Sequence, residues 1–93
     1  MKIIFLESAQ EELDAAVVWY DEQMYGLGTE FLDEVDRSIK RMTTWPYSGE
    51  QMEDGVRRCL VNRFPYGIFY GIDTSAIVIL AVSHLHRKPR YRL

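Results

Sequence analysis

Side chains that could do chemistry gather near the end of the chain. His84 closes an apolar run, and Arg87 and Tyr91 follow it. An imidazole titrates near neutral pH, so His84 could move a proton, and a guanidinium group could stabilise negative charge that develops on a substrate. Apolar strands fold without such residues. The segment therefore favours a partner or a substrate over a purely structural role.

A metal site is the first alternative use of these residues. His84 and His86 are spaced to share one strand face and could offer two imidazole ligands. No further His completes the set, and the single cysteine, Cys59, has no thiolate-stabilising neighbour in the sequence. The sequence therefore predicts no metal and no cofactor. The remaining structural alternative for His84 is a local hydrogen bond at the end of a strand.

Three arginines precede the next apolar segment. Arg57, Arg58 and Arg63 have no acidic residue near them between positions 55 and 72. They could be solvated charges that protect an edge strand, or they could anchor the carboxylates of a partner. The lack of local acids favours the second interpretation. With Arg87 and Arg90, they are the predicted residues for binding a protein partner or target. Strand alternation places Arg57 and Arg58 on opposite faces, so at most one of them can share a site with Arg63.

Charge is divided unequally along the chain. Residues 1–54 hold four basic and thirteen acidic residues, a formal charge of −9, and residues 55–93 hold seven basic residues and one acid, a charge of +6. The total of −3 argues against a protein that coats nucleic acid, which usually needs a basic domain. A confined basic patch can still dock an acidic partner.

The size and composition predict one small domain. The chain has 93 residues, of which 47% are hydrophobic. The apolar run at residues 76–82 is too short to span a bilayer, and the first residues lack the length of a signal peptide. One cysteine cannot form an internal disulfide, which fits a reducing compartment. We therefore expect a cytoplasmic protein without a membrane partner.

The first half of the chain predicts a short strand and two helices. An apolar strand at residues 2–6 is followed by Ser8 and Glu11, the spacing of a capping box, so a helix is expected from about Ala9. A glycine-containing break at residues 26–28 leads to a second helix, capped by Thr29 or a neighbour. The predicted apolar stripes are Leu13, Ala16, Val17, Tyr20 and Met24 in the first helix, and Phe31, Leu32, Val35, Ile39 and Met42 in the second.

The second half predicts a sheet. A polar loop is expected at residues 48–55, followed by strands at residues 56–63, 66–72 and 76–85, the last two joined as a hairpin. The final strand is apolar on both faces, as a central strand is. The order is β-α-α-β-β-β. The expected fold is α+β: a small, mainly antiparallel sheet with an αα-hairpin packed on one face.

A set of segments spread over nearly the whole chain points to a known family. These segments are Ala15 to Gln23, Gly26 to Gly28, Phe31, Leu32, Arg57, Arg58, Arg63 to Tyr66, Ile79 to His84, Arg87 and Pro89. Together they resemble the RelE/ParE toxin superfamily, and the ParE-like, or plasmid-stabilisation, branch in particular. The resemblance implies a small cytoplasmic toxin of a type II toxin–antitoxin system, held by a cognate antitoxin in a hetero-oligomer.

The superfamily contains ribosome-dependent mRNA endonucleases and non-catalytic poisons of DNA gyrase, and the two groups need different residues. The nucleases typically carry an arginine directly after the residue that opens the third strand. Gly67 stands at that position and Leu60 stands where a lysine is expected, although Arg58 does match a basic catalytic position. These departures favour the gyrase poison, which needs no catalytic residues and no cofactor.

Two alternatives remain open. A ribosome-dependent endoribonuclease would use His84, Arg87, Tyr91 and Arg58, because histidine or tyrosine occupies the terminal positions in some nuclease members. A degenerate toxin would retain only binding to its antitoxin and would cause no growth arrest. In the gyrase-directed group the helical hairpin is a candidate contact surface, which leaves Asp21 and Glu22 as open candidates.

Overall fold

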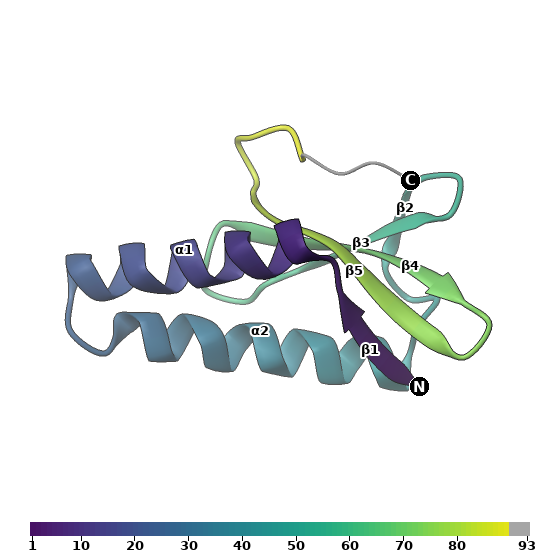
Figure 1. Ribbon diagram of the computed structural model, residues 1–93, viewed down its shortest axis with the longest axis horizontal. Helices are drawn as coiled ribbons and strands as arrows, with labels where there is room; N and C mark the ends of the chain where they lie inside the picture. Colours follow the sequence, from purple (N-terminus) through teal and green to yellow (C-terminus); the bar gives the residue numbers. More distant parts are fainter. Residues whose placement is uncertain (90–93) are drawn as a thin grey trace.

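The computed structural model describes residues 1–89 as two layers, a helical hairpin and a five-stranded sheet (Figure 1). The α+β class and the mainly antiparallel sheet are as predicted. The elements in chain order are β1 (Lys2–Phe5), α1 (Glu7–Gln23), α2 (Leu27–Thr44), β2 (Glu50–Glu53), β3 (Val56–Leu60), β4 (Tyr66–Asp73) and β5 (Ala76–His84).

The sheet has the strand order β1-β5-β4-β3-β2. β1 runs parallel to β5, with Ile3 opposite Ile77, and the other neighbours are antiparallel. β5 lies between β1 and β4, which explains why its sequence is apolar on both faces and confirms the prediction of an interior strand. A bulge between Phe69 and Tyr70 shifts the β4–β5 register.

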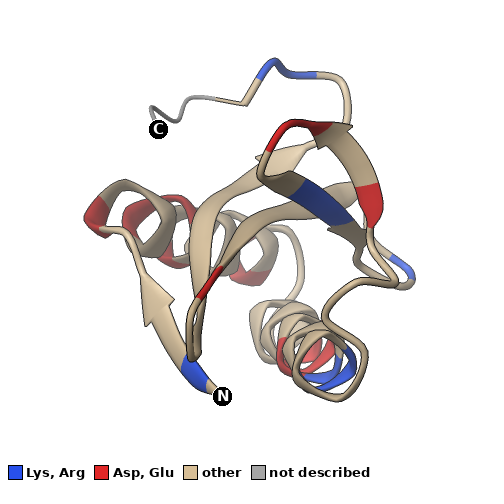
Figure 2. Cartoon of the chain, turned by 90° about the vertical axis from the view of Figure 1, so that its right-hand side faces the viewer, with Lys and Arg blue, Asp and Glu red and all other residues tan. Residues whose placement is uncertain are grey.

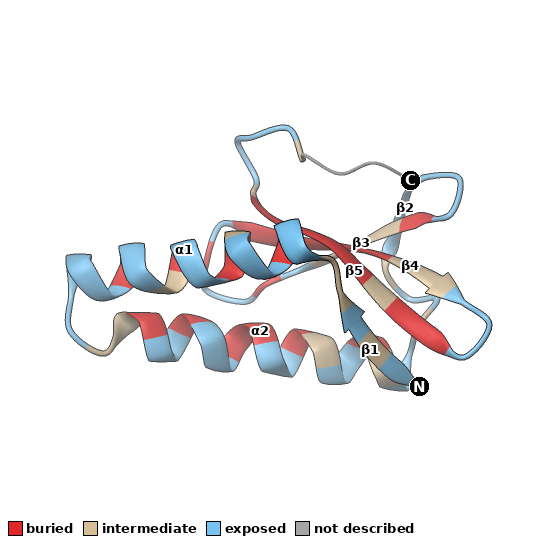
Figure 3. Cartoon of the chain, in the orientation of Figure 1, coloured by how far each residue is buried: buried red, intermediate tan, exposed pale blue. Residues whose placement is uncertain are grey.

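The main core lies between the helices and one face of the sheet (Figure 3). Most of the predicted apolar stripe of each helix faces this core, since helical spacing places those positions on one side. Met24 and Leu32 were predicted there too but are exposed, because Met24 is the C-cap residue beyond the end of α1 and Leu32 lies at the edge of the α2 stripe. The buried hydrophobic residues of the two helices are Ala9, Leu13, Ala16, Tyr20, Phe31, Val35 and Met42.

The helix starts differ from the prediction. α1 begins at Glu7, with Leu6 as its N-cap residue and no side-chain cap, so the expected Ser8 capping box is not used. α2 begins at Leu27 rather than after Thr29. Its first amides are bound by a side chain of α1.

Asp21 of α1 caps the start of α2. Its Oδ1 accepts the backbone N–H groups of Gly26 at 3.1 Å and Gly28 at 2.9 Å. Gly26 has a φ of 87°, a left-handed conformation that glycine adopts at little cost. Asp21, an open candidate for a target contact, is therefore a structural residue of the hairpin.

The predicted polar loop at residues 48–55 contains an additional strand, β2, and this part of the prediction is wrong. β2 pairs with β3, with Glu50 opposite Arg58, across a two-residue turn at Asp54 and Gly55. Gly55 has a φ of 77°, which such hairpin turns require. β2 is exposed along its whole length, so it lacks the apolar alternation by which strands are found in sequences.

Acidic residues lie on both helices, and basic residues lie on β3, on the segment after β5 and also on α2 (Figure 2). The acidic excess of residues 1–54 thus lies largely on the helices. Among residues 1–89, no helix is long and apolar enough to cross a membrane.

Candidate functional site

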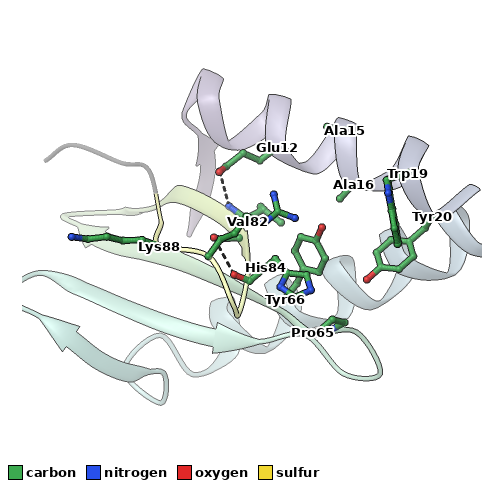
Figure 4. Close-up of a pocket in the computed structure, with 12 residues that line it drawn as sticks. Glu12, Ala15, Ala16, Trp19, Tyr20, Pro65, Tyr66, Val82, His84 and Lys88 are labelled. Carbon is green, nitrogen blue, oxygen red and sulfur yellow. Dashed lines mark hydrogen bonds between the residues drawn. The ribbon is translucent and has the colours of Figure 1, made fainter. Parts of the chain in front are cut away.

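A groove of about 650 Å³ runs between α1 and the ends of β4 and β5 (Figure 4). α1 forms one wall, and the last residues of β5 with the start of β4 form the other. Trp19 lies in this groove with 54% of its surface exposed. The groove is lined by Glu12, Ala15, Ala16, Trp19, Tyr20, Pro65, Tyr66, Val82, Ser83, His84, Arg87 and Lys88.

His84 stands at the end of β5, where its ring is held by two neighbours. The backbone N–H of His86 donates to His84 Nδ1 at 3.1 Å, and the Tyr66 ring packs edge-on at 5.3 Å between centroids. Because Nδ1 accepts this bond, the neutral imidazole carries its proton on Nε2. Partial burial lowers the pKa of His84 below its ordinary value, and the charges of Arg87 and His86 lower it further. Neutral His84 therefore presents a donor to the groove.

Arg87 and Lys88 supply positive charge at the same end of the groove. Both are exposed, and neither forms an ion pair with a carboxylate within residues 1–89. The backbone N–H of Arg87 donates to His84 O at 3.0 Å, which fixes the turn after β5. The predicted pair of His84 and Arg87 is therefore brought together here.

Arg58 approaches this end of the sheet from the other side. It lies opposite Phe69, which lies opposite Ala81, so these side chains share the sheet face that turns away from the helices, whereas His84 is on the other face by alternation. Arg58 also forms an ion pair with Glu50 at 2.8 Å, with 24% of its side chain exposed. A second hollow of about 350 Å³ is nevertheless lined by Arg58, His84 and Arg87 together, so the fold brings these three candidate residues to one end of the sheet.

The absence of a side chain at Gly67 leaves space for the side chain of Arg58. A Cβ atom at Gly67 would lie 3.0 Å from Arg58 Cδ and 3.4 Å from Leu85 Cδ2. The stem of Arg58 therefore occupies the space that a side chain at position 67 would need. An arginine at this position, as in the nuclease pattern, would require both neighbours to move.

Arg57 and Arg63 hold loops in place. The Arg57 guanidinium donates to the carbonyl oxygens of Tyr47 at 3.1 Å and Gly49 at 2.8 Å. Arg63 lies in the loop after β3, with a φ of 72°, and forms an ion pair with Glu30 of α2 at 2.9 Å. The prediction that the strand extends over residues 56–63 and so includes Arg63 is wrong, since β3 ends at Leu60.

The arginines also have acidic partners that the sequence did not indicate. A count of acids between positions 55 and 72 does not include these partners. Glu50 of β2 pairs with Arg58. Glu30 and Glu34 of α2 reach Arg63. Local sequence distance is a poor measure of proximity in a sheet that pairs distant segments. The expected partner-binding role of these arginines stays a prediction.

Glu12 is a groove residue that the sequence analysis did not select. Its Oε1 accepts the backbone N–H of Val82 at 3.0 Å, across the groove from α1 to β5 (Figure 4). The only signal in the sequence is its position directly before the core residue Leu13, which places it beside the apolar stripe. The Glu12 carboxylate therefore takes the place of the carbonyl oxygen that a neighbouring strand would offer to the Val82 N–H.

Two predicted residues, Arg90 and Tyr91, lie outside the described residues. Within residues 1–89, no group of three or more His, Cys, Asp or Glu side chains could hold a metal ion. His84 and His86 have ring centroids 5.3 Å apart, but His86 follows the end of β5 instead of sharing a strand face with it.

The family model for the ParE toxin of the type II toxin–antitoxin system parDE matches residues 3–89. The chain belongs to the ParE toxin family. This assignment confirms the ParE-like resemblance and the toxin class that follows from it. The match extends from β1 through both helices and the whole sheet, so it includes every wall of the groove.

A solved structure described as a chromosomal ParDE toxin–antitoxin system from P. aeruginosa shares the ParE fold of this chain. The TM-score is 0.78 at 18% sequence identity, over 90% of this chain and 95% of the other. At this identity the likeness concerns the fold alone. No curated protein matches the sequence.

Proposed function

We propose that this ParE-family chain stops growth by binding DNA gyrase, that it does so without cleaving RNA, and that a cognate antitoxin neutralises it. The observation that carries the proposal is the match of the ParE toxin family model to residues 3–89. The state of Arg58 agrees with it, since Arg58 is paired with Glu50 and fills the space above Gly67, although it lines one hollow together with His84. A cation that stabilises the charge developing on a phosphate must be free to contact the substrate.

The state of His84 supports the same proposal. A general base needs an unprotonated nitrogen, and the lone pair of Nδ1 is already bound to the N–H of His86. A general acid needs the imidazolium form, which the lowered pKa of His84 disfavours at neutral pH. His84 is thus better suited to donate a hydrogen bond than to transfer a proton.

The test is tight induction of the chain without any antitoxin, with labelled thymidine and labelled methionine followed over the first minutes. We expect thymidine incorporation to fall first, because gyrase inhibition stops replication. A first fall in methionine incorporation would support the endoribonuclease, which the shared groove of His84 and Arg87 favours. No effect on either would indicate the degenerate module.

A single variant makes this test specific to the candidate catalytic group. His84→Ala should leave the effect on thymidine incorporation, because gyrase poisoning uses no proton transfer at His84. Loss of all toxicity in this variant, with the fold intact by circular dichroism, would contradict the non-catalytic proposal.

A further inference from the structure

Residues 85–89, the tail segment, follow β5 and are tied to it by His84. A turn begins at this residue, since His84 O accepts the backbone N–H of Arg87 at 3.0 Å. A second bond lies inside the turn, because His84 Nδ1 accepts the backbone N–H of His86 at 3.1 Å. Asp and Asn side chains form the same bond to the amide two residues later in many turns. Here the acceptor is an imidazole, which changes its charge near neutral pH.

The turn determines where the tail segment lies. The backbone N–H of Leu85 donates to Pro65 O at 2.9 Å. Leu85 Cδ2 lies over Gly67, 3.4 Å from the place that a Cβ atom would take there. Pro89 lines the hollow of about 350 Å³ together with Phe69, a residue of the sheet face that turns away from the helices. The turn therefore directs the tail segment over this second face of the sheet.

Protonation of His84 removes the acceptor inside the turn. In the neutral ring Nε2 already carries a proton, so the added proton binds Nδ1. Nδ1 then becomes a donor that points at another donor, the N–H of His86. The bond between them is lost, and a backbone N–H without its partner costs free energy. Either the ring rotates away or the turn opens, and in both cases the closed turn loses one of its two bonds.

The groups around His84 strengthen this effect. Burial, and after it the charges of Arg87 and His86, lower the pKa of His84 below its ordinary value, so the bond is intact at neutral pH. A charged His84 is therefore repelled by the segment that it holds. The titratable and charged groups that contact its ring or line the two hollows beside it are Glu12 and Tyr20 of α1, Glu53 of β2, Arg58 of β3, Tyr66 of β4, and His86, Arg87 and Lys88 of the tail segment.

We propose that His84 is a pH-sensitive latch, whose Nδ1 holds the turn after β5 closed at neutral pH and whose protonation opens the turn and releases the tail segment from the second face of the sheet. The hollow lined by Arg58 and Phe69 is then open to solvent. The latch uses only contacts inside this chain. It is therefore independent of the toxin's target and of the antitoxin.

Three forms of the chain separate the latch from a general effect of acid. The unmodified chain loses the acceptor when His84 is protonated. His84→Asn keeps an acceptor oxygen that does not titrate, and His84→Ala has no acceptor. The readout is the protection of the His86 amide against hydrogen exchange, relative to an unstructured peptide at the same pH. The measurement runs from about pH 7.5 to about pH 5, on both sides of the ordinary pKa of histidine.

In the unmodified chain, protection of the His86 amide should fall about fivefold with acid, as the loss of one hydrogen bond predicts. In His84→Asn it should stay high, and in His84→Ala it should be low at both ends of the range. The amide of Ile68, a fully buried residue of β4, is the internal control for folding and should stay far better protected than His86 throughout. Protection that does not change in the unmodified chain, or that falls equally in His84→Asn, would overturn the proposal.

A second measurement follows the release of the tail segment directly. A Leu85 methyl group lies close to Gly67, so a nuclear Overhauser effect between that methyl group and a Gly67 Hα atom reports the closed position. This signal should weaken with acid in the unmodified chain and persist in His84→Asn. A signal of constant strength in the unmodified chain would show that the segment stays on the sheet when His84 is charged, which contradicts the latch.

Discussion

At the scale of single residues, the protonation of His84 depends on its neighbours more than on its own chemistry. Partial burial lowers the pKa of His84, and the positive charge of Arg87 in the next turn lowers it further. One ring nitrogen also accepts the His86 N–H, and all three conditions favour the neutral ring. The residue most suited to acid–base chemistry by type is thus held in a form that favours recognition.

The pH dependence of His84 can be measured directly. Its ring should titrate below about 6.5 in NMR, and Arg87→Ala should raise the midpoint because a nearby positive charge is removed. Lys88→Ala is the matched control and should have a smaller effect. Because the folded state binds this proton more weakly than the unfolded state, His84 lowers the free energy of unfolding as the pH falls below its ordinary pKa. A midpoint above 6.5 would contradict this account.

Asp21 provides a second prediction at this scale. Asp21→Ala leaves the amides of Gly26 and Gly28 without their acceptor, so it should lower the free energy of unfolding by about 1–2 kcal/mol. Asp21→Asn retains an acceptor oxygen and should lose less. Denaturation in urea would measure both variants, with Glu22→Ala as an exposed control. A loss no greater than that of the control would exclude the capping role.

At the scale of elements, the hairpin of α1 and α2 depends on a close approach of the two helices. Gly28 makes this possible, since a Cβ there would collide with the carbonyl oxygen of Val17 and lie 3.1 Å from its Cγ1. α1 also forms the wall of the groove, so the spacing of the helices helps to set where Glu12 stands relative to β5.

Gly28→Ala should therefore destabilise the protein despite the higher helix propensity of alanine. Overpacking of this kind costs about 1–3 kcal/mol, against a propensity gain of about 1 kcal/mol. The melting temperature should fall, whereas Thr29→Ala, an exposed position one residue later, should leave it nearly unchanged. A higher melting temperature for Gly28→Ala would show that the helices can separate without loss.

At the scale of the whole molecule, three of the five basic residues described between positions 55 and 89 are used internally. Arg57 binds loop carbonyls, and Arg58 and Arg63 pair with acids from other elements. Arg87 and Lys88 form no ion pair within residues 1–89 and lie together after β5, at the end of the groove, whereas the basic residues of α2 lie among acidic ones (Figure 2). Long-range attraction of an acidic partner should therefore be strongest at the end of the groove.

Charge reversal tests this distribution. Lys88→Glu should slow association with the purified cognate antitoxin about tenfold at low salt, and high salt should reduce the difference through screening. Lys40→Glu makes the same charge change on the exposed side of α2 and should have a smaller effect. Equal slowing by both variants would mean that net charge, and not the groove end, steers the partner.

The sequence by itself determined most elements, because helix and strand periodicity are local properties of the chain. The apolar stripes located α1, α2, β4 and β5, and the order of the motifs led to the ParE family. β2 was missed because it is exposed and lacks alternation, although the Asp54–Gly55 turn was a usable signal.

Only the tertiary structure decided which chemical groups meet. Strand register placed Arg58 and His84 on opposite faces, and it brought Glu50 to Arg58. The parallel pairing of β1 with β5 ends at Ile79, while the packing of α1 carried Glu12 to Val82. These contacts join segments up to 70 positions apart. Local patterns do not encode them, because they depend on how whole elements pack.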